Sequence, residues 1–177
     1  MPHSVSIGRP GPDEYAPFYA NYIGRTTDED LLGALAAQAD TISATFLGLP
    51  KEKVDFRYAE GKWTPREMLG HMIDGERVFG FRSLWFARQD PSPLPGFEEN
   101  DWANASGHGE VPLEELVQEF LAVRSGHLLM FKHLPADSWT RFGVASDRPV
   151  SVRALVYVML GHARHHLAVL KERYLAE

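Results

Sequence analysis

The stretch Thr64-Pro65-Arg66-Glu67 opens the segment that decides the fold, and Asp90-Pro91 closes it. A threonine followed three residues later by a glutamate is the capping-box signature of a helix N-terminus, and proline suits the first helical position. Met68 and Met72 recur at helical spacing behind this cap. The pattern predicts an amphipathic helix from Thr64 to about Gln89.

Three further segments outward from this helix also show apolar residues at helical spacing. Hydroxyl or proline residues stand at the expected starts, and glycine or proline stands near two of the expected ends. The three helices are expected from near Thr27 in Thr27-Asp28-Glu29-Asp30 to Gly48 and Pro50, from Pro112 to Leu134-Pro135, and from the Ser151 cap to about Tyr174. Four long helices in one short chain favour a helical bundle.

The connecting segments are irregular in composition. Residues 1–25 are rich in proline, glycine and tyrosine and are expected to be extended, whereas 91–111 is too long for a simple turn. The connector that holds Trp139, Phe142 and Val144 is expected to contain a short extended piece. No strand run alternates with the helices, so a parallel sheet is not expected. We therefore predict an all-α four-helix bundle that forms one domain over residues 1–177.

Composition narrows the functional classes. The 177 residues are 44% hydrophobic and 24% charged, which is an ordinary globular balance. The chain has no cysteine, which excludes disulfides, a cysteine nucleophile and thiolate metal ligands. The net charge is -6 and no basic run exceeds two residues, so nucleic acid is not an expected partner. Neither a signal peptide nor a run of about 20 apolar residues is visible, so we expect a cytoplasmic protein without a membrane partner.

Three histidines carry the strongest chemical signal. His162 and His166 are four residues apart and share one helical face, and His71 lies on the inward stripe of the helix that begins at Thr64. The four-residue spacing also occurs in zinc proteases, but Ala163 stands where those enzymes carry a glutamate base. Burying three imidazoles without partners would be costly. One divalent cation would satisfy all three and would keep open coordination positions.

Two charged residues of the same helix are candidates for the surroundings of such an ion. Asp74 lies three residues after His71 and is a candidate catalytic acid or base. Arg82 lies eleven residues after His71 and returns to nearly the same azimuth, so it is expected on the inward stripe. Its guanidinium would bind the carboxylate of a substrate or thiol, or else pair with an acid of the 98–101 loop.

The remaining histidines and loop acids give weaker signals. His165 is rotated away from His166 and is expected to pack beside the site or to contact solvent. The alternative is that it supports a metal ligand or transfers a proton. The loop that holds Glu98, Glu99 and Asp101 either covers the mouth of the site or wraps the bundle. Four histidines without a partner pattern are expected on the surface: His3, His108, His127 and His133.

Several motifs together resemble a known family. They are Gly61-Lys62-Trp63-Thr64-Pro65-Arg66-Glu67, Gly70-His71 through Arg77, Leu94-Pro95-Gly96-Phe97, Gly161-His162 through His166, and Arg9-Pro10 with Glu14-Tyr15. This sequence resembles the DinB-like family of bacterial metal-binding four-helix bundles, which includes YfiT-like metal-dependent hydrolases and thiol S-transferases. The resemblance implies that His71, His162 and His166 bind one divalent transition metal ion per chain, zinc or nickel. It also implies a possible homodimer and a possible low-molecular-weight thiol as cofactor.

The expected function is that of a metal-dependent enzyme acting on a small-molecule substrate, either a hydrolase or a thiol S-transferase. Such an ion polarises a substrate oxygen, activates water or binds a thiolate. The first alternative is a non-catalytic, stress-associated metal-binding protein, in which a fourth protein ligand would close the site. The second is a helical interaction module with no ion.

Overall fold

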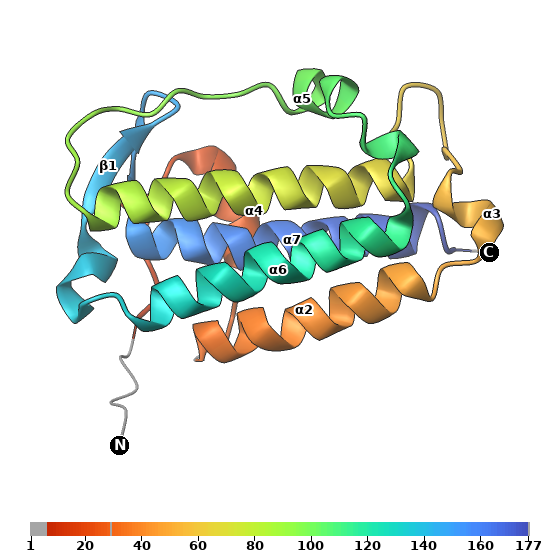
Figure 1. Ribbon diagram of the computed structural model, residues 1–177. Helices are drawn as coiled ribbons and strands as arrows, with labels where there is room; N and C mark the ends of the chain where they lie inside the picture. Colours follow the sequence, from red (N-terminus) through yellow and green to blue (C-terminus); the bar gives the residue numbers. More distant parts are fainter. Residues whose placement is uncertain (1–6, 29, 177) are drawn as a thin grey trace.

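Four long helices lie side by side and surround the core (Figure 1). The computed structural model describes residues 7–28 and 30–176. The long helices are α2 (Leu31–Leu47), α4 (Pro65–Ala87), α6 (Leu113–Lys132) and α7 (Val152–Arg173). Helix α4 packs against α7 and α6, and α2 packs against α6 and α7. The predicted all-α four-helix bundle is confirmed.

Shorter elements fill the connections between the long helices. They are η1 (Pro17–Tyr19), α1 (Ala20–Gly24), α3 (Lys51–Val54), α5 (Glu99–Ala105), η2 (His108–Glu110), η3 (Ala136–Thr140), β1 (Phe142–Ala145) and β2 (Arg148–Ser151). The connector before α7 is an antiparallel hairpin whose two-residue turn, Ser146-Asp147, has φ values of 53° and 59°. The short extended piece expected there is present. The segment 91–111 arches over α4 and carries α5 (Figure 1).

The N-terminal segment corrects one expectation. Residues 17–24 are helical rather than extended, and α1 packs against α7. A Cβ atom at Gly161 would lie 1.9 Å from the carbonyl oxygen of Tyr22, so the glycine lets the two backbones touch. This close approach seats α1 directly against α7. Residues 1–6 lie outside the described part of the chain.

The start of α2 corrects a second expectation. The helix begins at Leu31 rather than near Thr27, because the Asp30 carboxylate accepts a hydrogen bond from the Gly33 amide at 2.9 Å. Asp28 instead binds the Arg164 guanidinium of α7, with an N–O distance of 2.6 Å. Asp28 therefore joins α7 to the segment that precedes α2.

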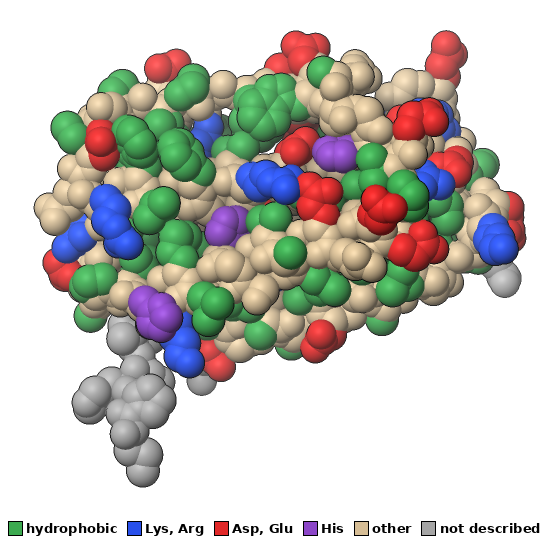
Figure 2. Space-filling model, in the orientation of Figure 1, with side chains coloured by type: hydrophobic (Ala, Val, Ile, Leu, Met, Phe, Trp, Pro, Cys, Tyr) green, Lys and Arg blue, Asp and Glu red, His purple; other side chains and the backbone are tan. Residues whose placement is uncertain are grey.

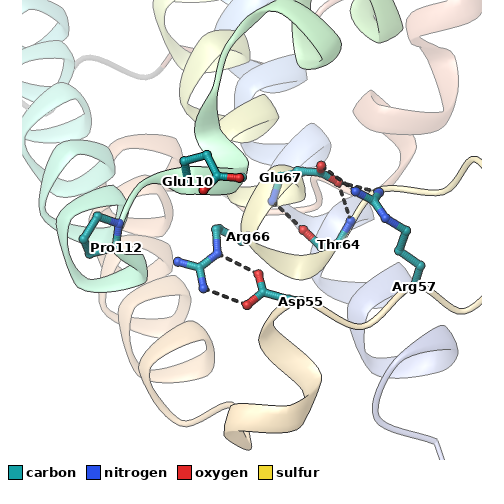
Figure 3. Close-up of a pocket in the computed structure, with 8 residues that line it drawn as sticks. Asp55, Arg57, Thr64, Arg66, Glu67, Glu110 and Pro112 are labelled. Carbon is teal, nitrogen blue, oxygen red and sulfur yellow. Dashed lines mark hydrogen bonds and ion pairs between the residues drawn. The ribbon is translucent and has the colours of Figure 1, made fainter.

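The N-terminus of α4 has the predicted capping box (Figure 3). The Thr64 side chain accepts from the Glu67 amide, and the Glu67 carboxylate accepts from the Thr64 amide. A hollow of about 580 Å³ surrounds this cap. Its arginines are already neutralised, since Arg57 pairs with Glu67 and Arg66 pairs with Asp55.

A buried ion pair joins three of the long helices. Arg124 of α6 donates to both carboxylate oxygens of Glu76 on α4 and to the Leu35 carbonyl of α2 at 2.8 Å. Burial alone would raise the pKa of Glu76, but Arg124 and His127 together outweigh burial and lower it. His127 lies beside this pair, with its Nδ1 atom 3.6 Å from a Glu76 oxygen. His127 is partly buried, so the expectation that it is a surface residue is only partly correct.

The outer surface shows mixed charge. On the face that Figure 2 shows, acidic and basic side chains are interspersed, and hydrophobic side chains gather toward the end that holds β1. Across residues 7–28 and 30–176, every helix falls short of the length or the apolar character that a membrane span requires.

Glu14 fixes the N-terminal segment to α7. The Nε atom of Arg153 donates to the Glu14 carboxylate at 2.7 Å, a second guanidinium nitrogen binds the other oxygen, and the Gly11 amide donates at 2.8 Å. Burial alone would raise the pKa of Glu14, but these hydrogen bonds outweigh it and lower the pKa from 4.5 to about 2. The ionised carboxylate therefore favours the folded state.

We expect Glu14→Gln to reduce the free energy of unfolding by about 1–3 kcal/mol at neutral pH. Because the folded pKa is depressed, the contribution of Glu14 is complete above about pH 4.5 and is lost as the pH falls toward 2. The difference between parent and variant should therefore narrow below pH 4.5 in urea denaturation. Glu60→Gln, at an exposed position, is the control. A difference that stays constant with pH would contradict this role.

Candidate metal centre

Three imidazoles converge between α4 and α7. The Nε2 atom of His162 lies 2.9 Å from that of His71 and 3.1 Å from that of His166. One ligand atom from each ring falls within 4.8 Å of the other two, and all three residues are buried. The structure thus brings the three sequence-predicted histidines to one point.

Burial keeps these imidazoles neutral. It lowers the pKa of His71 to about 4 and, with the neighbouring imidazoles, the pKa values of His162 and His166 well below their usual range. A ring nitrogen carries either one hydrogen or one lone pair, so the Nε2 atom of His162 can form only one well-directed hydrogen bond. It nevertheless faces two other nitrogens at hydrogen-bonding distance. A cation would accept all three lone pairs, so the donor set fits a divalent transition metal.

Aromatic rings hold the imidazoles in place. Trp63, just before α4, stacks on His71 with ring centroids 4.5 Å apart. Tyr22 of α1 and Phe79 of α4 pack edge-on against His162, with centroid distances of 5.4 and 5.6 Å. The rings are therefore oriented by packing, which precise ligand geometry requires.

A cavity of about 260 Å³ extends from the histidines along α4. His71 and His162 form one part of its wall. Aromatic side chains form much of the remainder, and a few polar groups join them. Its other lining residues are Phe18, Tyr19, Tyr22, Gly75, Phe79, Arg82, Phe97, Glu99 and Ser146. This mixture of apolar walls and few polar groups is typical of small-molecule sites.

Arg82 lies on the inward stripe and lines this cavity. Its guanidinium donates to the Pro95 carbonyl at 2.7 Å, to the Ser146 hydroxyl at 3.2 Å and to the Tyr19 hydroxyl at 3.3 Å. The alternative of an ion pair with an acid of the 98–101 loop is wrong for the residues that the structure describes. The loop contributes the ring of Phe97 and the side chain of Glu99 to the cavity wall instead.

Asp74 lies apart from the cavity. The residues that form the cavity wall do not include it, and it is half-buried. Burial raises the pKa of Asp74, although the nearby His108 and Arg77 oppose this effect. Its catalytic role therefore stays a prediction.

The other histidines occupy varied surroundings. His165 is half-buried beside the site, and its ring contacts those of Tyr22 and His166. His108 is also partly buried, with its ring close to Gly70 on α4, so its predicted surface position is only partly correct. His133 is exposed as expected, whereas His3 lies outside the described residues.

Sequence reasoning did not identify several lining residues. Tyr19 and Tyr22 belong to the segment expected to be extended, and Ser146 reaches the cavity through the turn of the hairpin. No local pattern relates these positions to the histidines, because tertiary packing alone brings them together. Trp63 stood in the family motif without an assigned role.

Removing one imidazole should abolish tight metal binding. We expect His166→Ala to weaken zinc binding by more than about 100-fold, because substitutions of groups that merely support ligands already cost 10–100-fold. A titration against a competing chelator, on protein prepared without a histidine tag, measures this. His133→Ala is the exposed control. If His166→Ala bound zinc as tightly as the parent, His166 would not be a ligand.

The glycine opposite His162 offers a subtler test. A Cβ atom at Gly75 would lie 2.9 Å from the Cε1 atom of His162, so Gly75→Ala should displace this ring and weaken zinc binding by about 10-fold. Gly126→Ala on α6 is the matched control, since no atom outside its own helix lies within 4 Å of the new methyl group. Equal affinities in the two variants would show that His162 tolerates displacement.

Proteins from two bacteria resemble this chain over most of its length. A protein of Geobacillus thermodenitrificans named "Putative metal-dependent hydrolase" is 25% identical over 146 residues, which cover 79% of this chain and 80% of that protein. A protein of Geobacillus kaustophilus with the same descriptive name is 21% identical and covers 79% and 80%.

A solved structure and a family model extend the likeness. YfiT from Bacillus subtilis, described as a probable metal-dependent hydrolase with an unusual four-helix bundle topology, aligns with a TM-score of 0.71 and 14% identity. The alignment covers 96% of this chain and 94% of that one, and it supports the fold. The family model of the DinB superfamily matches residues 34–170. The chain therefore belongs to the DinB superfamily.

Proposed function

We propose that the protein is a metal-dependent hydrolase of small molecules, with one divalent ion held by His71, His162 and His166. The observation that carries this proposal is the position of the histidines: the three converge, and two of them, His71 and His162, lie in the wall of a cavity. The names of the relatives and of YfiT support the same class of reaction. Neutral imidazoles suit several transition ions, and zinc and nickel are the ones we propose.

The surroundings of the histidines favour catalysis over a purely structural ion. When bound, a divalent ion supplies Lewis-acid activation of a substrate oxygen and of water. The described residues bring three ligand groups together and no fourth, as in catalytic rather than structural zinc sites. The aromatic wall limits access of bulk water to the reacting groups. A non-catalytic metal-binding protein, the alternative, would not need such a cavity.

Two carboxylates are candidates for proton transfer. Glu99 lines the cavity, and its partial burial together with the neighbouring Glu98 raises its pKa, which favours the protonated form that can donate a proton. Asp74 lies off the cavity wall. We therefore assign the role to Glu99 and keep Asp74 as the alternative.

Thiol S-transfer is the second reaction that the site would support. Because the chain has no cysteine, the thiol would have to be a separate small molecule that enters the cavity. The same ion would then bind a thiolate. The two reactions differ in whether a thiol is consumed, so a single assay separates them.

We expect ester, amide or phosphate-ester substrates to be hydrolysed by zinc- or nickel-loaded protein and not by metal-free protein. The panel should include thiols paired with electrophiles, with product formation followed chromatographically. Glu99→Gln should lower kcat by about 10²-fold or more, whereas Asp74→Asn should leave it nearly unchanged.

Controls make the outcome decisive. His133→Ala should be fully active, because this exposed side chain does not contact the cavity. Turnover that requires the thiol would favour the transferase. Zinc binding at one ion per chain without any turnover on the panel would support the non-catalytic alternative. A larger loss of activity in Asp74→Asn than in Glu99→Gln would reverse the assignment of the proton-transfer group.

A further inference from the structure

Arg82 is a buried cation without an opposing charge. Its side chain is 3% exposed, and in the described part of the chain no carboxylate pairs with it. Arg124, which is buried to a similar degree, binds Glu76 through two nitrogens. Burying a charge without a partner is costly. The contrast indicates that the negative partner of Arg82 is a bound ligand rather than one of the described residues.

The guanidinium also has donors to spare. Arginine carries five N–H groups, and Arg82 uses three of them on neutral oxygens of Tyr19, Pro95 and Ser146. Two N–H groups therefore have no acceptor among the described residues. Phe97 lies over the guanidinium at 6.0 Å, so one face of the cation is covered by an aromatic ring.

Two hydroxyl groups join the guanidinium. The Tyr19 and Ser146 oxygens accept from Arg82, so their own hydrogens are free to point toward a ligand. Burial raises the pKa of Tyr19, which keeps its hydrogen in place. Ser146 adopts a φ of 53° in the hairpin turn, a strained conformation for a residue that is not glycine. This turn conformation places the Ser146 side chain at the wall of the cavity.

The cavity joins this polar group to the histidines. Eleven residues of α4 separate His71 from Arg82, which corresponds to about 16 Å along the helix axis. Arg82 nevertheless lines the same cavity as His71 and His162. Aromatic side chains line the space between them, and its volume of about 260 Å³ suits a small molecule.

We propose that the cavity binds small carboxylates with a flat apolar body, the carboxylate lying on Arg82, Tyr19 and Ser146 and the other end pointing to the histidines. The planar guanidinium matches a carboxylate, and the aromatic walls match the body. The orientation of the substrate rests on the proposed hydrolase function. Binding of the carboxylate does not, because Arg82 needs no metal to act.

Binding of simple acids tests the proposal. Phenylacetate, 3-phenylpropanoate and 4-phenylbutanoate should be compared with their neutral amides by calorimetry on metal-free protein, since a metal ion would itself attract carboxylates. We expect at least one acid to bind about 10-fold or more tightly than its amide. Arg82→Gln should remove this preference. Arg88→Gln removes the same charge from an exposed arginine just after α4, and this variant should retain the preference for the acid.

Two milder variants cover the case in which Arg82→Gln does not fold. Tyr19→Phe and Ser146→Ala each remove one hydroxyl, and each should weaken binding of the acid several-fold with little effect on the amide. Circular dichroism and Tm establish folding. Equal binding of acid and amide, no binding of any acid at millimolar concentration, or a preference that persists in the folded variants would overturn the proposal.

The result also separates this proposal from the hydrolase assignment. Protein that selects acids through Arg82 but hydrolyses no substrate would refute the hydrolase and leave the carboxylate site in place. An active hydrolase whose selection of acids appears only with metal bound, and is unchanged in Arg82→Gln, would refute the carboxylate site alone.

Discussion

The packing of α4 against α7 is the constraint on which the rest of the structure depends. It places one imidazole from α4 against two from α7 in a buried, uncharged cluster. Three polar rings in a bundle core lower stability unless something satisfies their nitrogens. Apolar side chains at these positions would avoid this cost, so the cluster is not explained by stability alone.

The two buried arginines show how the bundle divides stability from function. Arg124 is neutralised by Glu76 and also binds the backbone of α2, so its charge joins three helices. Arg82 lies on the same helix as Glu76 but about 120° away around its axis. It points toward the cavity, where its hydrogen-bond acceptors are neutral. One helix therefore contributes Glu76 to a paired charge network and Arg82 to a cavity wall where its donors meet only neutral acceptors.

Local rules predicted the helical frame, and tertiary contacts determined what they could not. The Thr64 cap and the four-residue spacing of His162 and His166 depend on neighbours within about one helical turn, so they can be predicted from the sequence. The start of α2 differs from the expectation because Thr27 and Asp30 are both suitable helix caps, and Asp30 is the one whose side chain accepts from the Gly33 amide. Helical azimuth correctly placed Arg82 inward, but azimuth carries no information about partners.

The cavity was the part least predictable from the sequence, because segments outside the four long helices contribute most of the residues that line it. Tyr19, Phe97 and Ser146 come from three connections that are distant in the sequence, and each reaches the cavity through a contact between elements. The helices fix the three histidines, whereas the connections surround the space beside them. Because substitutions in connections disturb a helical core little, such a bundle can change the lining of its cavity while keeping its histidine cluster. The family fold and the three histidines therefore argue for the class of chemistry, and the residues of the connections argue for the molecule on which it acts.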